Sequence, residues 1–267
     1  MTRLKTLFST ELAFAIDAVR KAGEMQLARL GSDLRVTEKS QANIVTEVDL
    51  AVETMFRERV AATFPDHGVM GEEFAEARPG GSGPVCRWLF DPVDGTANYA
   101  HGLPFFCASL AFEVDGVVEV AAIFEPTRRE LFTATRGGGA VMNDRPIRVS
   151  ATARLADALV ATGFPHNATS RDAAAERAIG EFAVRSRGVR RLGSAALDLC
   201  YVACARTDAF YDTHLKPWDT AAGGLIVSEA GGRVTGLDAA AFSNYRGGVL
   251  ASNGRFHDDL VAITAAI

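Results

Sequence analysis

The chain has few cysteines, no long run of one charge and no long hydrophobic run. Only four of its 267 residues are cysteines, and no paired cysteines or histidines have the spacing of a zinc site. We therefore expect buried, reduced thiols, which favour a cytoplasmic location. The formal net charge is −5 and no Lys/Arg cluster resembles a nucleic-acid footprint, so no direct nucleic-acid binding is expected. No apolar stretch is long enough to span a membrane, and residues 1–10 lack the apolar core of a signal peptide.

The composition is otherwise that of an ordinary globular protein. Hydrophobic residues make up 48% and charged residues 23%, enough for a sizeable core without disulfide bonds. The length fits one large domain or two closely fused halves. We divide the chain into an N-terminal α+β half, residues 1–150, and a C-terminal α/β half, residues 151–267, which together form one compact unit. Strands followed by an alternating half predict a layered α+β architecture.

Hydrophobic periodicity and turn residues predict the elements of each half. The first half is expected to hold helices over 10–30 and 43–64, the second after a short extended entry, and strands at 69–71, 88–90, 105–114, 117–124 and 130–135, with the sheet broken by the glycines at 137–139. The second half is expected to hold strands at 158–162, 189–192, 209–211 and 249–252, and helices over 171–185, 194–205, 220–230 and 256–267.

An acidic turn, Asp91-Pro92-Val93-Asp94-Gly95-Thr96, directly follows a predicted strand. Pro92 cannot donate to a strand ladder, so we expect the chain to leave the sheet there. Two carboxylates three residues apart suit Mg²⁺, which prefers hard oxygen ligands, and the Val93 carbonyl could add another. Gly95 would let the backbone approach a phosphate. Asp and Gly also favour ordinary turns, so this motif alone does not decide between a metal site and a structural turn.

Three further acidic segments are ambiguous when each is taken alone. Gly71-Glu72-Glu73 could be a solvated loop, and Thr46-x-x-Asp49 reads as a helix capping box. Asp219 could simply cap the helix that follows it. Within that helix, Gly223-Gly224 costs about 1 kcal/mol per residue relative to Ala, so it requires a reason such as close packing.

Together these segments resemble the inositol monophosphatase family, and the resemblance covers residues 39–251. The segment 88–99 (WLFDPVDGTANY) resembles the first family signature, and the segment 218–232 (WDTAAGGLIVSEAGG) resembles the second. Gly193-Ser194-Ala195-Ala196 is similar to the start of the family's substrate-side helix. The resemblance implies a layered αβαβα sandwich of the inositol monophosphatase and fructose-1,6-bisphosphatase type.

The resemblance also implies a Mg²⁺-dependent, lithium-sensitive phosphomonoesterase with two to three ions per active site and metal-activated water. Glu72, Asp91 and the Val93 carbonyl would hold the first ion. Asp91, Asp94 and Asp219 would hold the second, and Glu72 would also reach a third. Asp49 and Thr96 would orient the attacking water and, with Glu72, form the catalytic set. Asp94, Gly95 and Thr96 would bind the substrate, with Gly95 and Thr96 at its phosphate, and its alcohol would contact Gly193, Ser194, Ala195, Asp212 and Asp219.

Several features depart from the family pattern and leave the substrate open. The loop at 39–43 (KSQAN) lacks the usual Pro and Asp, although Lys39 could serve as a phosphate-side cation. Asp212 stands where the family often has Glu, which puts specificity for inositol in question. Residues 165–185 should lie near the substrate mouth but carry no usable signature.

Three hypotheses about function remain. Inositol-1-phosphate is the favoured substrate of a homodimeric enzyme. The same chemistry could act on histidinol phosphate, a sugar bisphosphate or a nucleotide phosphate. A transcription-associated scaffold protein, which some bacterial relatives of the family resemble, is the alternative of another class.

Overall fold

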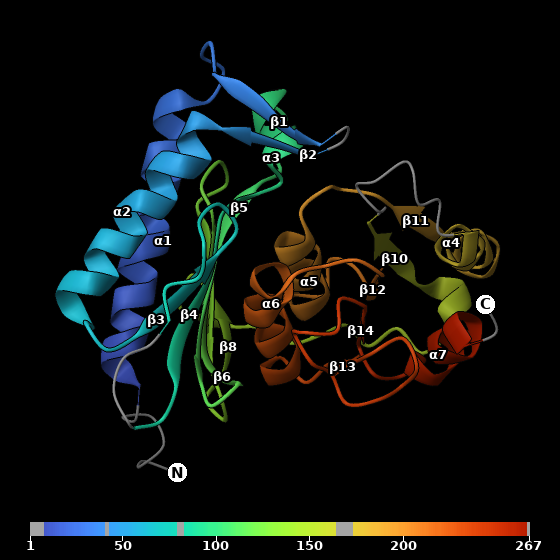
Figure 1. Cartoon of the computed structure of the whole chain (residues 1–267). Helices are drawn as coiled ribbons and strands as arrows, with labels where there is room; N and C mark the ends of the chain where they lie inside the picture. The colour runs from blue at the N-terminus through green and yellow to red at the C-terminus, as the bar shows by residue number, and fades with distance from the viewer. Residues whose placement is uncertain (1–7, 41–42, 79–82, 164–172, 266–267) are drawn as a thin grey trace.

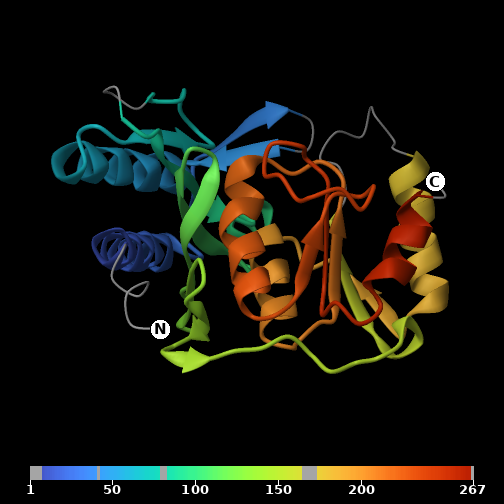
Figure 2. The same ribbon diagram turned by 90° about the horizontal axis from the view of Figure 1, so that it is seen from below.

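The computed structural model describes residues 8–40, 43–78, 83–163 and 173–265, and these form five layers (Figure 1). Helices α1 (Ser9–Arg29) and α2 (Glu47–Thr63) cover one face of a seven-stranded sheet. Helices α5 (Ala195–Ala203) and α6 (Pro217–Glu229) lie between that sheet and a five-stranded sheet. Helices α4 (Ala173–Arg185) and α7 (His257–Ala265) cover the far side (Figure 2). The predicted αβαβα sandwich is confirmed.

The seven-stranded sheet lies in the first half of the chain. Its order is β3 (Gly68–Gly71), β4 (Cys86–Asp94), β5 (Cys107–Val114), β6 (Val117–Glu125), β7 (Glu130–Thr135), β8 (Gly139–Met142) and β9 (Arg145–Pro146). Only the β3–β4 pair of this sheet is parallel. The predicted hairpin joins β5 to β6 through Asp115 and Gly116, whose φ angles are 50° and 80°. A separate ribbon pairs β1 (Val36–Ser40) with β2 (Asn43–Thr46), next to the short helix α3 (Thr96–Ala100).

The five-stranded sheet lies in the second half. Its order is β11 (Gly188–Arg190), β10 (Leu159–Thr162), β12 (Ala209–Asp212), β14 (Val249–Ser252) and β13 (Arg233–Thr235), and a single 3₁₀ turn (Leu155–Asp157) precedes β10. β10 is parallel to β11 and β12, whereas β14 is antiparallel to both of its neighbours. The four strands predicted for this half are present. The division of the chain near residue 150 stays a prediction.

The expected exit from the sheet at Pro92 was wrong. β4 continues to Asp94, because Asp91 pairs with Ser109 and Asp94 pairs with Cys107. Three steps along β4 therefore match two steps along β5, and one extra residue forms a β-bulge. The bulge lets a residue without an N–H stay within a paired strand.

The expected break at the glycines 137–139 was also wrong. Gly137 and Gly139 have φ angles of 72° and 82°, and they form the turn that joins β7 to β8 within one sheet. Strands β1, β8, β9 and β13 were not predicted. Of the predicted helix at 171–185, residues 171 and 172 lie outside the described residues, as does the stretch 165–170.

The cysteines only partly follow the prediction. All four are free; Cys107 and Cys200 are buried, whereas Cys86 and Cys204 are partly exposed. In the described ranges, no helix is both long enough and apolar enough to cross a membrane.

Close packing of the two central helices explains the glycine pair of α6. A Cβ atom on Gly223 would lie 2.6 Å from Leu199 Cδ1 of α5, and one on Gly224 would lie 2.8 Å from Phe242 Cε1. The helix therefore accepts the cost of two glycines so that its neighbours can approach its backbone.

Gly223→Ala should lower the free energy of unfolding by about 1–3 kcal/mol, the usual cost of overpacking a core, although Ala is the better helix former. Gly180→Ala is the matched control. Gly180 is exposed in α4 with no atom within 4 Å of an added Cβ, so it should gain about 0.5–1 kcal/mol. Urea unfolding measures both changes. Equal stabilisation by the two substitutions would contradict the close contact of α5 and α6.

Candidate active site

A pocket of about 690 Å³ brings together segments from both halves of the chain. Asp49 does not line this pocket. It lies behind Thr96, which does line the pocket and is hydrogen-bonded to Asp49. The other predicted site residues line the pocket: Glu72, Asp91, Val93, Asp94, Gly95, Thr96, Gly193, Ser194, Ala195, Asp212 and Asp219, together with Lys39.

The β4 bulge carries the first two carboxylates of the site. Asp91 is buried, and its Oδ1 accepts a hydrogen bond of 2.9 Å from the Val93 N–H. Behind the bulge, Gln26 Nε2 of α1 donates to the Pro92 carbonyl at 2.7 Å. Gln26 is fully buried and was not predicted as part of the site. A signal was present: Gln26 lies seven residues after Val19 and therefore falls on the buried face of the predicted helix.

The start of helix α5 holds Asp94. Its Oδ2 accepts hydrogen bonds of 2.6 Å from both the Ser194 hydroxyl and the Ala196 N–H. The N-terminus of a helix favours a negative charge, so α5 stabilises the carboxylate as well as fixing its direction. Ser194 lines the pocket and its hydroxyl binds Asp94, whereas its predicted place beside the substrate's alcohol stays a prediction.

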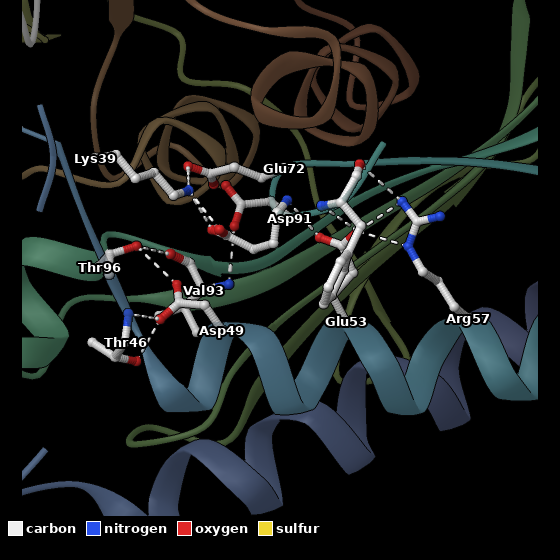
Figure 3. A network of polar contacts seen from close by, with 11 residues as sticks. Lys39, Thr46, Asp49, Glu53, Arg57, Glu72, Asp91, Val93 and Thr96 are labelled. Carbon is white, nitrogen blue, oxygen red and sulfur yellow. Dashed lines mark hydrogen bonds and ion pairs between the residues drawn. The ribbon is translucent and has the colours of Figure 1, made fainter. Parts of the chain in front are cut away.

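The start of helix α2 holds Asp49, and Figure 3 shows this network. Thr46 is the N-cap, and Asp49 at the third helical position accepts from the Thr46 N–H at 2.9 Å and from its hydroxyl. The predicted capping box is therefore present. On its other side, Asp49 Oδ1 lies 3.1 Å from Thr96 Oγ1, which is also 2.9 Å from the Val93 carbonyl oxygen. The single hydroxyl proton of Thr96 can serve only one of these two acceptors at a time.

Helix α6 holds Asp219 in the same manner. Asp219 occupies the third helical position, and its Oδ2 accepts a hydrogen bond of 2.7 Å from the Lys216 N–H. Asp219 was expected to cap a helix beginning at Thr220; the helix begins at Pro217, and Asp219 binds the N-cap backbone from within its first turn. The same side chain lines the pocket. For Asp49 and Asp219 alike, the structural role also fixes where the carboxylate points.

Lys39 pairs with the two glutamates of the β3 exit, as Figure 3 shows for Glu72. Its Nζ lies 3.3 Å from Glu72 Oε1 and 2.6 Å from Glu73 Oε2. Burial raises the pKa of Glu73 to about 7, against the opposing effect of Lys39. Buried Glu53 accepts the Glu73 N–H at 2.8 Å, and a Cβ on Gly71 would lie 2.2 Å from Glu53 Oε1. A glycine is thus required before the two glutamates.

Two glycines meet where the halves of the chain touch. Gly95 has a φ of 98°, and a Cβ on it would lie 3.0 Å from the Phe105 carbonyl oxygen and 3.2 Å from that of Gly193. Asn98 Nδ2 donates to the carbonyls of Phe105 and Leu192, each at 2.8 Å. This contact fixes the acidic bulge against the loop that begins α5.

The acidic side chains of the pocket raise one another's pKa. Burial raises the pKa of Asp91 well above its usual range, and the charges of Glu72, Asp94 and Asp219 raise it further. Burial also raises the pKa of Asp94 to about 6, although its hydrogen bonds from Ser194 and Ala196 oppose the shift. Burial likewise raises the pKa of Asp219 well above its usual range, and the charge of Asp94 raises it further. Such a group of carboxylates favours a bound cation or protons.

The donor set fits Mg²⁺ in kind. Within the described ranges, no group of three or more His, Cys, Asp or Glu side chains is arranged so that it could hold a metal ion. Lys39 is paired with Oε1 of Glu72. Magnesium does not require three, since it is commonly bound by one or two carboxylates together with water and substrate phosphate. The oxygen-only chemistry of Glu72, Asp91, Asp94 and Asp219 meets that requirement.

Comparison with known proteins places the chain in a family. The model of the inositol monophosphatase family matches residues 9–267. The chain belongs to the inositol monophosphatase family. It is 39% identical to an inositol-1-monophosphatase of Rhizobium meliloti, with 92% of each chain covered. It is also 39% identical to Nus factor SuhB of Pseudomonas aeruginosa, with 91% of each covered.

A solved structure supports the same assignment. The extragenic suppressor protein suhB of Bartonella henselae superposes with a TM-score of 0.91 at 36% identity, covering 96% of this chain and 98% of that one. Membership of the inositol monophosphatase family supports phosphatase chemistry for this chain.

Several residues of the pocket, an arginine and an aspartate among them, were missed by the sequence analysis. Arg191 and Asp198 both line the pocket. The signal for Asp198 is a single carboxylate within the apolar run 195–203. Burial raises its pKa, the charges of Asp94 and Asp212 raise it further, and Arg191 opposes the shift.

Metal-free protein should lose stability as the pH rises through the pKa of Asp49. Burial raises that pKa from 3.8 to about 6. Because the folded-state value is the higher one, the folded protein binds the proton more tightly, so its stabilisation is complete below about pH 4 and is lost through about pH 6.

Asp49→Asn tests this prediction, because its amide can accept from Thr46 and donate to Thr96. In chelator at pH 8 the variant should be more stable than the wild type by roughly 3 kcal/mol, and at pH 4 about equally stable. Urea unfolding between these pH values gives the difference. Exposed Asp66→Asn is the control and should follow the wild type. A variant that is less stable than the wild type at pH 8 would show that the charged carboxylate stabilises the fold.

Proposed function

We propose that the chain hydrolyses a phosphate monoester in the presence of Mg²⁺, with inositol-1-phosphate as the preferred substrate. The observation that carries this proposal is that four carboxylates from three separate segments line one pocket. Glu72 follows β3, Asp91 and Asp94 lie on the β4 bulge, and Asp219 starts α6. A phosphate dianion would be repelled by these charges alone, so the arrangement makes chemical sense only with cations bound.

The predicted roles of the acidic residues follow from this arrangement. Glu72, Asp91, Asp94, Asp219 and the Val93 carbonyl would hold two to three Mg²⁺ ions. When bound, Mg²⁺ would neutralise the phosphate charge and make an attacking water easier to deprotonate. Asp94 keeps one fixed direction for this role, since Ser194 and the Ala196 N–H already bind one of its oxygens.

Asp49 and Thr96 would orient the attacking water. The Thr96 hydroxyl lies 3.1 Å from Asp49 Oδ1, so a hydroxyl that donates to Asp49 keeps a lone pair free for a proton of the water. With its pKa near 6, Asp49 can accept a proton at neutral pH. The buried capping box holds the carboxylate in place during this exchange.

The remaining predicted contacts belong to the substrate. Gly95, Thr96 and Asp94 would contact the phosphate, and Lys39 stays a candidate cation on that side. The residues that would contact the alcohol are Asp219, Gly193, Ser194, Ala195 and Asp212. Histidinol phosphate, a sugar bisphosphate and a nucleotide phosphate are alternative substrates of the same chemistry. A homodimer and a cytoplasmic location stay expectations drawn from the family and the composition.

A transcription-associated scaffold role is the second candidate. The observation that favours it is the name of the Pseudomonas relative, Nus factor SuhB, which matches at the same 39% identity as the Rhizobium inositol-1-monophosphatase. The two roles are compatible in one protein. Asp94→Asn separates them, because binding to a macromolecular partner needs no complete set of metal ligands.

Purified protein should release phosphate from inositol-1-phosphate in a panel of monoesters with Mg²⁺, and excess chelator should abolish the activity. Asp94→Asn should lower kcat/KM by at least about 100-fold, the upper range for partners that merely support metal ligands. Exposed Asp66→Asn is the control for loss of one charge. No phosphate release from any substrate would refute the enzyme proposal, and full activity of Asp94→Asn would refute the assigned site.

Lithium should inhibit phosphate release, because it would compete for one of the magnesium positions formed by the carboxylates. Colorimetric phosphate assays at fixed Mg²⁺ and rising LiCl measure the effect, with NaCl at equal ionic strength as the control. Equal rates in the two salts would argue that no magnesium position here resembles that of the lithium-sensitive family members.

A further inference from the structure

Asp198 is a buried carboxylate, and one of its two oxygens has no hydrogen-bonding partner in the described part of the chain. Its residue is 1% exposed, and its Oδ1 is buried without a partner. Most buried side-chain oxygens in native proteins are satisfied, and an unsatisfied charged oxygen is costly. A feature of this kind calls for a ligand or an ordered water at that oxygen.

The position of Asp198 directs it to the substrate pocket. It lies in the first turn of α5, where its N–H donates to the Ser194 carbonyl at 2.9 Å. Ser194, in the same turn, binds the metal-side residue Asp94. The carboxylate of Asp198 lines the same cavity and interacts electrostatically with both Asp94 and Asp212. One helix start therefore serves both ends of the pocket.

Asp212 forms the opposing wall of this part of the pocket. It is buried at the end of β12, and its Oδ1 accepts a hydrogen bond of 3.0 Å from the His214 N–H. A Cβ on Gly163 would lie 1.8 Å from Asp212 Oδ2, so the strand exit at Gly163 leaves room for this carboxylate. Asp198 and Asp212 come from different layers and give this region two acceptor groups.

We infer that Asp198 is a specificity-determining residue that accepts a hydrogen bond from a hydroxyl of the alcohol, so that the pocket selects a polyol phosphate. The inference rests on the proposed phosphatase function and deepens it. Hydroxyl groups are neutral donors, and a buried unpaired carboxylate is an acceptor whose bonds are stronger than those between neutral groups. A site that presents such acceptors discriminates against alcohols that lack the donors.

The pocket carries charges of both signs. A second phosphate or an ammonium group would meet the carboxylates of Asp198 and Asp212 and also the cations of Arg191 and Lys216, so each would face charges of its own sign. A neutral, donor-rich alcohol brings no further charge into this region.

Asp198→Leu tests the inference, because leucine has a similar shape and no acceptor. Its kcat/KM for inositol-1-phosphate, divided by that for p-nitrophenyl phosphate, should fall about 10- to 100-fold, which corresponds to one hydrogen bond to a charged group. Asp198→Asn should restore part of this ratio through its amide oxygen. Exposed Asp66→Asn should leave the ratio as in the wild type.

Thermal unfolding of the same proteins distinguishes a substrate contact from a structural one. Loss of a buried, unpartnered carboxylate should raise the midpoint of Asp198→Leu by a few degrees. A fall of both specificity constants by equal factors together with a lower midpoint would show a structural role. An unchanged ratio with a raised midpoint would show that only water uses this oxygen, and either result would overturn the inference.

Two further outcomes are separable. Wild-type preference for histidinol phosphate, lost in Asp198→Leu, would assign the residue to an amine and overturn the polyol assignment. If no phosphate ester is hydrolysed at all, ligand-detected NMR with free inositol tests whether the pocket binds a polyol. Binding to the wild type but not to Asp198→Leu would retain the polyol site without the proposed function, and equal signals would overturn it.

Discussion

Burial of several carboxylates in one pocket is the constraint on which the rest of this structure depends. Burial raises the pKa of Asp91, Asp94 and Asp219 and their mutual repulsion raises it further, so metal-free protein bears an electrostatic cost in holding them together. The fold opposes that repulsion with hydrogen bonds from the backbone. These bonds leave part of each carboxylate facing the cavity and fix its direction, which is what a cation site requires. The donors are the N–H groups of Thr46 for Asp49, Val93 for Asp91, Ala196 for Asp94 and Lys216 for Asp219.

Three helix starts supply this support, and they explain the layered architecture around the site. Helix α2 lies in an outer layer, whereas α5 and α6 lie between the two sheets (Figure 1). The first turns of α5 and α6 line the pocket, and that of α2 lies behind Thr96, so the partial positive charges of these helix starts oppose the excess of negative charge there. The close contact between Gly95 and Gly193 then keeps the β4 bulge in register with α5. A substitution that separated the layers would change the direction of the acids before it removed any of them.

Much of this site could be predicted from sequence because its parts obey local rules. The capping box of α2 follows from residues within one helical turn, so Thr46 and Asp49 were predicted correctly as its members. The start of α6 was predicted at Thr220 and lies at Pro217, which places Asp219 within the first turn. The Pro92 bulge was missed, since it depends on register with β5, whose partners lie more than ten residues away. Gln26 acts through a carbonyl 66 positions further along the chain, and no local pattern contains that information. What sequence could not supply was contact between distant segments.

One acid of the pocket differs from the others in how it is satisfied, and this difference bears on function. A backbone N–H donates to each of Asp91, Asp94, Asp212 and Asp219, so the fold sets their direction before any ligand arrives. Asp198 Oδ1 has no donor in the described residues, so the fold alone does not explain this buried oxygen. Overall similarity cannot rank the possible roles, because identity is 39% to relatives with two different names. The unpaired acid indicates a binding site, because burying an unpaired oxygen costs free energy. A ligand, or a water that a ligand would displace, must offset that cost.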